Sequence, residues 1–264
     1  MTKRIYPSDL SDGEYKFLKK YLPTQKRGGR PVKYQRREIL NAIFYLLRTG
    51  CAWRYLPTEY PHWKTVYHYF REWRILGLWQ QINMRLRRLL RKRAGKHEQA
   101  SAAILDSQSV KTCDTAREQT GFDSGKKVFG RKRHILVDTL GLLITVVIHA
   151  ASISETAGAR MMLSELEFQF WRLKLIWLDG GYMDSLFEWI KTLNRWRTIR
   201  IERVKRSDNQ KGFAVLPKRW IVERTFGWLS KQRRLSKDYE ALCDTSEAMV
   251  YAAMVRLMLA RLDT

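Results

Sequence analysis

Three acidic residues constrain this chain more than any other feature. Asp106 follows the apolar pair Ile104-Leu105, Asp179 follows the apolar run 173–178, and Glu223 lies within a helix-like pattern. Short apolar runs of this kind predict β-strands, and a rigid strand can fix a carboxylate whose tip stays accessible. Three converging carboxylates would repel one another without a cation between them, and hard oxygen donors suit Mg²⁺. The sequence therefore predicts a divalent metal site built by strands and a helix.

The strongly basic composition indicates the substrate of such a site. The chain has 264 residues, with 50 Lys and Arg against 26 Asp and Glu, a net charge of +24 and a pI near 10.2. Such an excess attracts a polyanion and gives salt-sensitive affinity. The first 100 residues hold 23 of the basic residues but only 7 of the acidic ones. We therefore expect phosphodiester chemistry on double-stranded DNA, docked by the amino-terminal part.

Other classes of protein fit the sequence less well. The three cysteines are scattered, and the five histidines form no zinc-ligand pattern with them. The longest apolar run, 140–151, is interrupted by polar residues and is too short to span a bilayer. No secretory segment opens the chain. The expectation is a reduced, cytoplasmic protein without a membrane anchor.

Helical patterns dominate the first hundred residues, with helices predicted over 11–22, 36–48, 63–73 and 76–93. Ser11 and Glu14 have the spacing of a capping box. Helices around a glycine-containing connection in a basic setting favour an all-α, helix-turn-helix-like DNA-binding region over residues 1–100. The thin basic segment 26–33 could lie in a minor groove. The residues predicted to contact DNA here are Arg27, Arg30, Lys33, Lys64, His68 and Arg71.

Strand patterns begin after residue 101. A strand is predicted to begin at 104–106, further strands are predicted at 134–138, 142–150, 173–178 and 198–204, and helices at 155–171, 185–193, 219–229 and 246–262. This order predicts an α/β fold, a mixed sheet flanked by helices. Asp138 also lies near a strand end, but it precedes a Leu-Gly turn, which we expect it to cap.

With these features the sequence resembles bacterial insertion-sequence transposases of the DDE type. The resemblance is carried by LDSQSVKT around Asp106, by the segment 125–141, by WLDGGY around Asp179, and by RWIVERTFGWL around Glu223. These segments occur in the family's order, with 73 and then 44 residues between successive acids. The resemblance extends over nearly the whole chain. The resemblance implies an RNase H-like catalytic domain over residues 101–264, preceded by the helical DNA-binding region.

The resemblance also implies chemistry for the three acids. Asp106, Asp179 and Glu223 would be the catalytic residues and would bind Mg²⁺, with Mn²⁺ able to substitute. Two metals roughly 3.5–4 Å apart can activate an attacking oxygen and stabilise a departing one. Such an enzyme would cut at the terminal inverted repeats of its element and join the 3′-OH ends to target DNA. A homodimer or a larger synaptic assembly on DNA is implied, in the bacterial cytoplasm and associated with the nucleoid.

Further DNA contacts are expected around the acids. Arg219 lies one turn before Glu223, where it could pair with that acid or grip a phosphate. Relatives carry a Tyr-Arg-Glu-Lys pattern here, of which this chain keeps the Arg and the Glu. Leu216 stands at the tyrosine position, and Ser230, with Lys231 beside it, at the lysine position. The other predicted contacts, in the loop and strand after the first acid, are Lys126, Lys127, Arg131, Lys132 and Arg133.

Three alternatives remain compatible with the sequence. A metal-dependent nuclease on the same fold would cut DNA without joining it. A catalytically silent DNA-binding regulator derived from a transposase would bind only, although the presence of all three acids counts against decay. A basic RNA-associated protein would prefer RNA to duplex ends.

Overall fold

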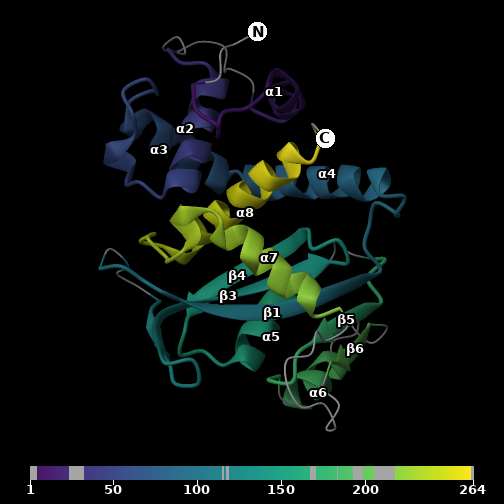
Figure 1. Cartoon of the computed structure of the whole chain (residues 1–264). Coiled ribbons are helices and arrows are strands. Elements are labelled where there is room, and N and C mark those ends of the chain that lie inside the picture. Colours follow the sequence, from purple (N-terminus) through teal and green to yellow (C-terminus); the bar gives the residue numbers. More distant parts are fainter. Residues whose placement is uncertain are drawn as a thin grey trace.

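The computed structural model describes residues 5–23, 33–114, 116, 119–166, 171–182, 184–192, 199–204 and 218–262. Within them a mixed sheet lies between two groups of helices (Figure 1). This arrangement confirms the predicted α/β, RNase H-like class with a helical region before it. The predictions at Arg27, Arg30 and Leu216 lie outside the described residues.

Four helices form the first hundred residues, as predicted. Ser11 and Glu14 make both hydrogen bonds of the capping box at the start of α1. Gly50 has a φ of 75° and ends α2, and Gly77, with a φ of 62°, separates α3 from α4. A single 3-10 turn, η1, covers the predicted loop at Trp53–Tyr55. The helices are α1 (Asp12–Lys19), α2 (Arg36–Thr49), α3 (Trp63–Ile75) and α4 (Leu78–Arg93).

The sheet combines antiparallel and parallel pairing. Strand β3 pairs antiparallel with β1, β2 and β4, while β1, β5 and β6 run parallel to one another. The strand order is β2-β3-β1-β5-β6, with β4 also on β3. The strands are β1 (Ala102–Lys111), β2 (Gly121–Asp123), β3 (Val128–Asp138), β4 (Leu143–Ala150), β5 (Leu175–Leu178) and β6 (Arg200–Arg203).

Helices cover both faces of the sheet because successive strand residues point to opposite sides. In β1, Ala103 and Leu105 pack with the cluster that contains α5 and α6, whereas Ile104 packs with the cluster that contains α7 and α8. The remaining helices are α5 (Glu155–Glu165), α6 (Asp184–Thr192), α7 (Trp220–Ser230) and α8 (Cys243–Ala260), with a short 3-10 turn, η3 (Arg233–Leu235), between the last two.

The helix α8 joins the two ends of the chain into one core. It packs against α4, α2 and α3 on one side and against β4 and α7 on the other (Figure 1). Thirteen of its 18 residues are buried. The largest hydrophobic cluster therefore runs without interruption from the amino-terminal helices to the sheet. The domain boundary predicted near residue 100 falls between α4 and β1. Residues from both sides of that position contribute to this one core.

Strand β3 differs most from the sequence prediction. It begins at Val128 rather than at His134, so that Arg131, Lys132 and Arg133 are part of the sheet. Each has an internal partner: Arg131 donates to the carbonyl of Glu240, Lys132 to that of Ile153, and Arg133 to that of Leu235. These hydrogen bonds satisfy charged groups that would otherwise not be tolerated in a strand interior.

Asp138 has the structural role that the sequence indicates. Its Oδ1 accepts hydrogen bonds from the backbone N–H groups of Leu140 and Leu142, at 2.9 and 3.0 Å. It therefore caps the turn into β4 and does not join the other acids. None of the described helices is long and apolar enough to cross a membrane.

Candidate catalytic site

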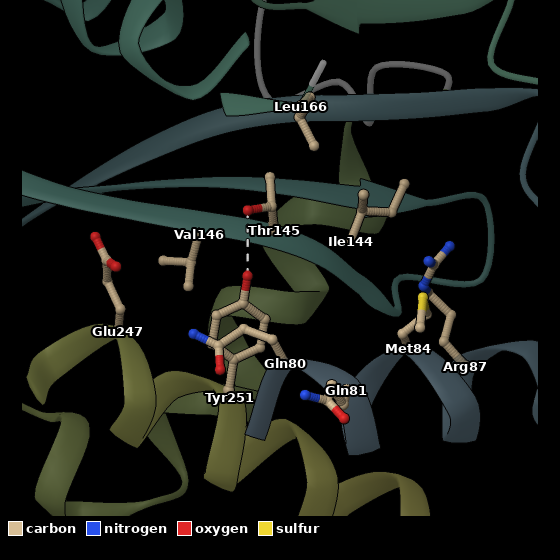
Figure 2. Close-up of a pocket in the computed structure, with 10 residues that line it drawn as sticks. All are labelled: Gln80, Gln81, Met84, Arg87, Ile144, Thr145, Val146, Leu166, Glu247 and Tyr251. Carbon is tan, nitrogen blue, oxygen red and sulfur yellow. Dashed lines mark hydrogen bonds between the residues drawn. The ribbon is translucent and has the colours of Figure 1, made fainter. Parts of the chain in front are cut away.

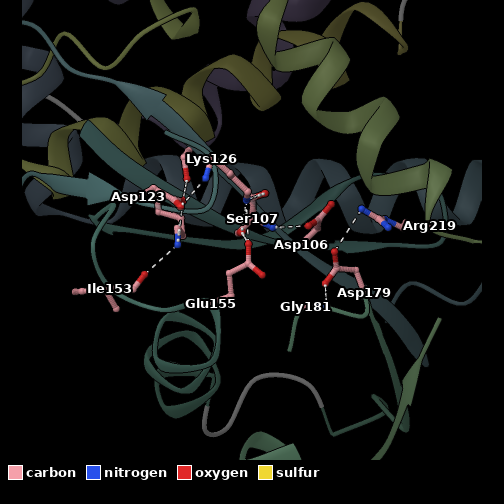
Figure 3. A network of polar contacts seen from close by, with 11 residues as sticks. Asp106, Ser107, Asp123, Lys126, Ile153, Glu155, Asp179, Gly181 and Arg219 are labelled. Atoms are coloured by element: carbon pink, nitrogen blue, oxygen red, sulfur yellow. Dashed lines mark hydrogen bonds and ion pairs between the residues drawn. The ribbon is translucent and has the colours of Figure 1, made fainter. Parts of the chain in front are cut away.

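Asp106 and Asp179 lie side by side because of the register of two parallel strands. Ile104 in β1 pairs with Trp177 in β5, so the positions two residues further along are Asp106 and Asp179. Strand β5 ends at Leu178, whereas β1 continues to Lys111. Asp106 thus lies within β1 rather than at its end, beside the end of the parallel strand β5. The two carboxylates face the side of the sheet covered by α7 (Figure 3).

The electrostatics of Asp106 reflect this crowded position. Burial, together with the negative charge of Asp179, raises the pKa of Asp106 to about 6. The backbone N–H of Ser107 donates to Asp106 Oδ1 at 2.7 Å, and this hydrogen bond lowers the pKa of Asp106. A cation beside these two carboxylates would relieve both the desolvation and the repulsion.

Helix α7 carries the third acid and an arginine that reaches the second. The guanidinium of Arg219 lies 3.3 Å from a carboxylate oxygen of Asp179 and 3.3 Å from one of Glu223. The side chain of Glu223 is 55% exposed, while Ile221 and Val222 beside it are buried. The predicted pairing of Arg219 with Glu223 is therefore confirmed. Arg219 stands between the second and third acids.

The described residues do not gather the three acids into one metal-binding group. No cluster of three or more His, Cys, Asp and Glu side chains in the described part of the chain is close enough to hold a cation. The donors themselves still suit Mg²⁺, because Asp106 and Asp179 present adjacent carboxylates in a partly buried place. Glu223 would complete the set from a helix that contacts β1. The residues therefore fit a divalent metal, with Arg219 occupying the space between two of the carboxylates.

Gly181, the second glycine after Asp179, lies close to two carboxylates. Its N–H donates to Asp179 Oδ1 at 2.8 Å. A Cβ added at this position would lie only 2.7 Å from Glu155 Oε2 and 3.1 Å from Asp179 Oδ1. A side chain here would displace the Glu155 carboxylate, so glycine lets this carboxylate of α5 approach the backbone closely.

A polar network that the sequence did not indicate borders the two aspartates (Figure 3). Glu155, at the start of α5, accepts from Ser107 Oγ at 3.0 Å and from Lys126 Nζ at 2.9 Å. Burial alone would raise the pKa of Glu155, but the hydrogen bond and charge of Lys126 outweigh it and lower that pKa. A Ser-Glu pair opening a helix is a common capping pattern, so no local signal distinguishes this glutamate.

The basic residues predicted to contact DNA fall into two groups. Arg131, Lys132 and Arg133 are at most 4% exposed, so the predicted DNA contacts do not extend to these three. The others among the described residues are accessible, and Arg219 is partly so at 32% of its side chain. The exposed ones are Lys33, Lys64, His68, Arg71, Lys126, Lys127 and Lys231.

The exposed face of α7 also carries aromatic side chains. Arg224 stacks over Trp220 and Trp228, with its guanidinium 4.5 Å from each ring centre. Trp220 is 41% exposed, so it lies at the surface of α7 rather than in the core. Its position one turn from Glu223 places an accessible indole ring beside the third acid.

A separate pocket lies away from these acids. This cavity of about 260 Å³ lies between β4 and the helices α4 and α8. Figure 2 shows the residues that line it. Thr145 and Tyr251 share a hydrogen bond of 3.1 Å on its wall. Its lining includes none of the three acids. The candidate site at β1, β5 and α7 therefore lies outside this cavity.

Comparisons with known proteins agree with this geometry. Residues 97–258, which include all three acids, match a family model described as "Transposase DDE domain". Residues 10–83 match one described as "Putative transposase of IS4/5 family". The uncharacterized 16.2 kDa protein of insertion element IS402 from Burkholderia cepacia is 32% identical over 89 residues, which are 33% of this chain and 58% of that relative. The chain thus spans a little over half the length of this curated relative.

Proposed function

Since the chain belongs to the family of DDE transposases, we propose that it cuts DNA at the ends of an insertion element and joins the 3′-OH ends to target DNA. The observation that supports this most is the register that sets Asp106 beside Asp179 below a helix carrying Glu223. Such an arrangement suits an oxygen nucleophile and phosphodiester substrates, and it requires no covalent protein intermediate. The net charge of +24 matches a DNA substrate.

Each residue of the site has a role in this proposal. Asp106 and Asp179 would hold Mg²⁺ or Mn²⁺ from the sheet, and Glu223 would hold it from α7. When bound, the metal supplies Lewis-acid stabilisation for the attacking and departing oxygens of the phosphodiester. Arg219 balances the charge of Asp179 and Glu223 and offers its guanidinium to a phosphate oxygen.

The amino-terminal helices bind the terminal inverted repeats in this proposal. On α3, Val66 and Phe70 are buried against the core, and Lys64, His68 and Arg71 are exposed along the opposite side. A helix with one packed face and one cationic face suits contact with a DNA groove and its phosphates. Two element ends must meet one target, so we propose a homodimer or larger assembly on DNA.

The experiment that tests the function is metal-dependent cleavage and joining of DNA that carries the gene's own flanking sequence. Wild type is compared with Glu223→Ala and with Glu188→Ala, a control at an exposed acid of α6. We expect Mg²⁺- or Mn²⁺-dependent cutting and strand transfer in wild type and the control, and neither in Glu223→Ala, which should still bind DNA.

Other outcomes identify the alternatives. Cutting without joining would make the protein a nuclease, and binding without either activity in wild type would make it a regulator. A preference for RNA over duplex ends would exclude the transposase. Cleavage that survives Glu223→Ala would mean that a different residue supplies the third ligand.

A further inference from the structure

A lysine and a glutamate form an ion pair directly beside the first catalytic aspartate. Lys126 Nζ lies 2.9 Å from Glu155 Oε1 and 3.3 Å from Ser107 Oγ, and Ser107 is the residue after Asp106. The same ammonium lies 3.4 Å from the carbonyl oxygen of Ser107. Lys126 is therefore held against the strand that carries Asp106, with a positive charge that acts on that carboxylate.

The loop that carries Lys126 is itself anchored to the sheet. The backbone N–H of Lys126 donates to Asp123 Oδ1 at 3.0 Å, and Asp123 Oδ2 accepts from Ser109 Oγ at 2.6 Å. Lys132, which is buried, lies 3.3 Å from the same carboxylate. Asp123 is 8% exposed, so this anchor is shielded from solvent. The position of Lys126 is thus fixed at its backbone as well as at its ammonium.

Glu155 connects this anchored lysine to the second aspartate. Its Oε1 receives Lys126 and Ser107, while its Oε2 lies against Gly181, beside Asp179 Oδ1. The network drawn in Figure 3 therefore runs along one edge of the Asp106–Asp179 pair, opposite the edge where Arg219 lies. Two cations, Arg219 and Lys126, flank the two carboxylates.

Exposure distinguishes the two ends of the ion pair. The side chain of Lys126 is 41% exposed, and that of Glu155 is 24% exposed. The ammonium can therefore meet a ligand from solvent while it keeps Glu155, by exchanging one of its two longer contacts with Ser107, at 3.3 and 3.4 Å. A phosphate bound at Asp106 and Asp179 would bring its oxygens to this side of the site. A pair this exposed contributes little to folding stability alone.

We infer that Lys126 contacts the phosphate group that is cut, and that Glu155 is a positioning residue that holds Lys126 for this contact. The inference rests on the proposed function, because it assumes a phosphodiester at the two aspartates. It assigns Glu155 a role in the site, and it gives Lys126 a place at the scissile phosphate rather than along the flanking backbone.

Single-turnover cleavage at saturating protein, together with the Kd for the same DNA, tests the inference. The variants are Lys126→Ala, Lys126→Arg, Glu155→Gln and the double variant Lys126→Ala/Glu155→Gln. We expect Lys126→Ala to lower the cleavage rate constant about 100-fold while the Kd changes less than about threefold, as for a contact made at the reacting group. Glu155→Gln should lower it about tenfold, and the double variant should be no slower than Lys126→Ala.

The conservative variant and a matched control exclude a merely structural role. Lys126→Arg should recover most of the rate, because it keeps a cation that can pair with Glu155. Lys191 and Glu188 form a similar pair on α6, 2.8 Å apart and exposed, so Lys191→Ala and Glu188→Gln should match wild type. A thermal unfolding scan of each variant should show a midpoint close to that of wild type.

The outcomes separate this inference from the proposed function. If wild type shows no metal-dependent cleavage, the proposed function fails. If wild type cuts DNA but Lys126→Ala and Glu155→Gln cut it equally fast, only the inference is overturned. Rate losses that add up in the double variant, or that accompany a lowered unfolding midpoint, would also overturn it.

Discussion

The guanidinium of Arg91 in α4 lies 2.9 Å from the carboxylate of Asp138 at the end of β3, and the two side chains are 5% and 0% exposed. The other oxygen of Asp138 caps the turn into β4. Arg91 also donates from Nε to the carbonyl of His97 at 2.8 Å. This buried pair therefore ties the amino-terminal helices to the catalytic sheet.

Removing Arg91 should destabilise the whole protein. We expect Arg91→Ala to lower the free energy of unfolding by about 3–5 kcal/mol, because it leaves the Asp138 charge buried without its partner. Urea denaturation measures this difference. Lys92→Ala is the control, since Lys92 pairs with Glu98 on the surface and its loss should leave stability nearly unchanged. Equal effects of the two substitutions would contradict the structural role of the buried pair.

Two helical glycines should respond in opposite directions to alanine. A Cβ at Gly158 in α5 would lie 2.3 Å from His149 Nε2 and 2.4 Å from His134 Nε2, whereas a Cβ at Gly227 in α7 would meet nothing within 4 Å. Gly158→Ala should therefore destabilise the protein by about 1–3 kcal/mol through overpacking. Gly227→Ala should stabilise it by up to about 1 kcal/mol. Thermal unfolding of both variants checks the prediction, and a stabilising Gly158→Ala would contradict it.

The buried histidine pair should make stability depend on pH. Burial lowers the pKa of His134 well below its usual value and also lowers that of His149. Just below pH 6.5 the unfolded chain then binds more protons than the folded one. The contribution of these histidines to the free energy of unfolding is therefore complete above pH 6.5 and declines as the pH falls. The expected slope is up to about 1.4 kcal/mol per pH unit for each histidine.

Comparison with a variant isolates this effect. Asp106 acts in the opposite direction, because its raised pKa makes the folded chain bind more protons near pH 6. Urea unfolding of wild type and His134→Leu should be measured between pH 5.5 and 7.5, roughly the window around the unfolded pKa. Stability of the variant should fall less steeply toward pH 5.5. Identical slopes would contradict the assignment.

The exposed face of α3 should contribute to DNA affinity through phosphate contacts. Lys64→Ala and Arg71→Ala together should weaken binding at low salt and reduce the slope of log K against log salt by about 2. Fluorescence anisotropy at several salt concentrations gives this slope. Lys191→Ala on α6 serves as the control for loss of one positive charge. An unchanged slope in the double variant would place the DNA elsewhere on the molecule.

Much of the fold follows from local patterns in the sequence. The capping box at Ser11 and the apolar runs of β4 and β5 predicted elements that the structure contains. The pairing of Arg219 with Glu223 followed from helical spacing alone. These features depend on residues within one or two turns of each other, so the sequence displays them directly.

The errors concern contacts between distant parts of the chain. Three consecutive cations at 131–133 resemble a solvated hairpin, but Arg131 finds its partners more than 100 residues away, at Asp238 and Glu240. Glu155 resembles an ordinary first-turn acid, and only the folded chain brings it to Ser107 and Lys126. No periodicity encodes such partners, because tertiary packing selects them.

The position of α8 has a consequence for how the protein is made. The amino-terminal helices bury their apolar faces against residues 243–260, which the ribosome adds about 150 residues after α4 is complete. A growing chain therefore exposes the apolar sides of α2 to α4 through most of its synthesis and closes them only when α8 emerges. A prematurely terminated product would consequently be prone to aggregate rather than persist as a competing DNA binder. Formation of the continuous core is thus coupled to the synthesis of α8.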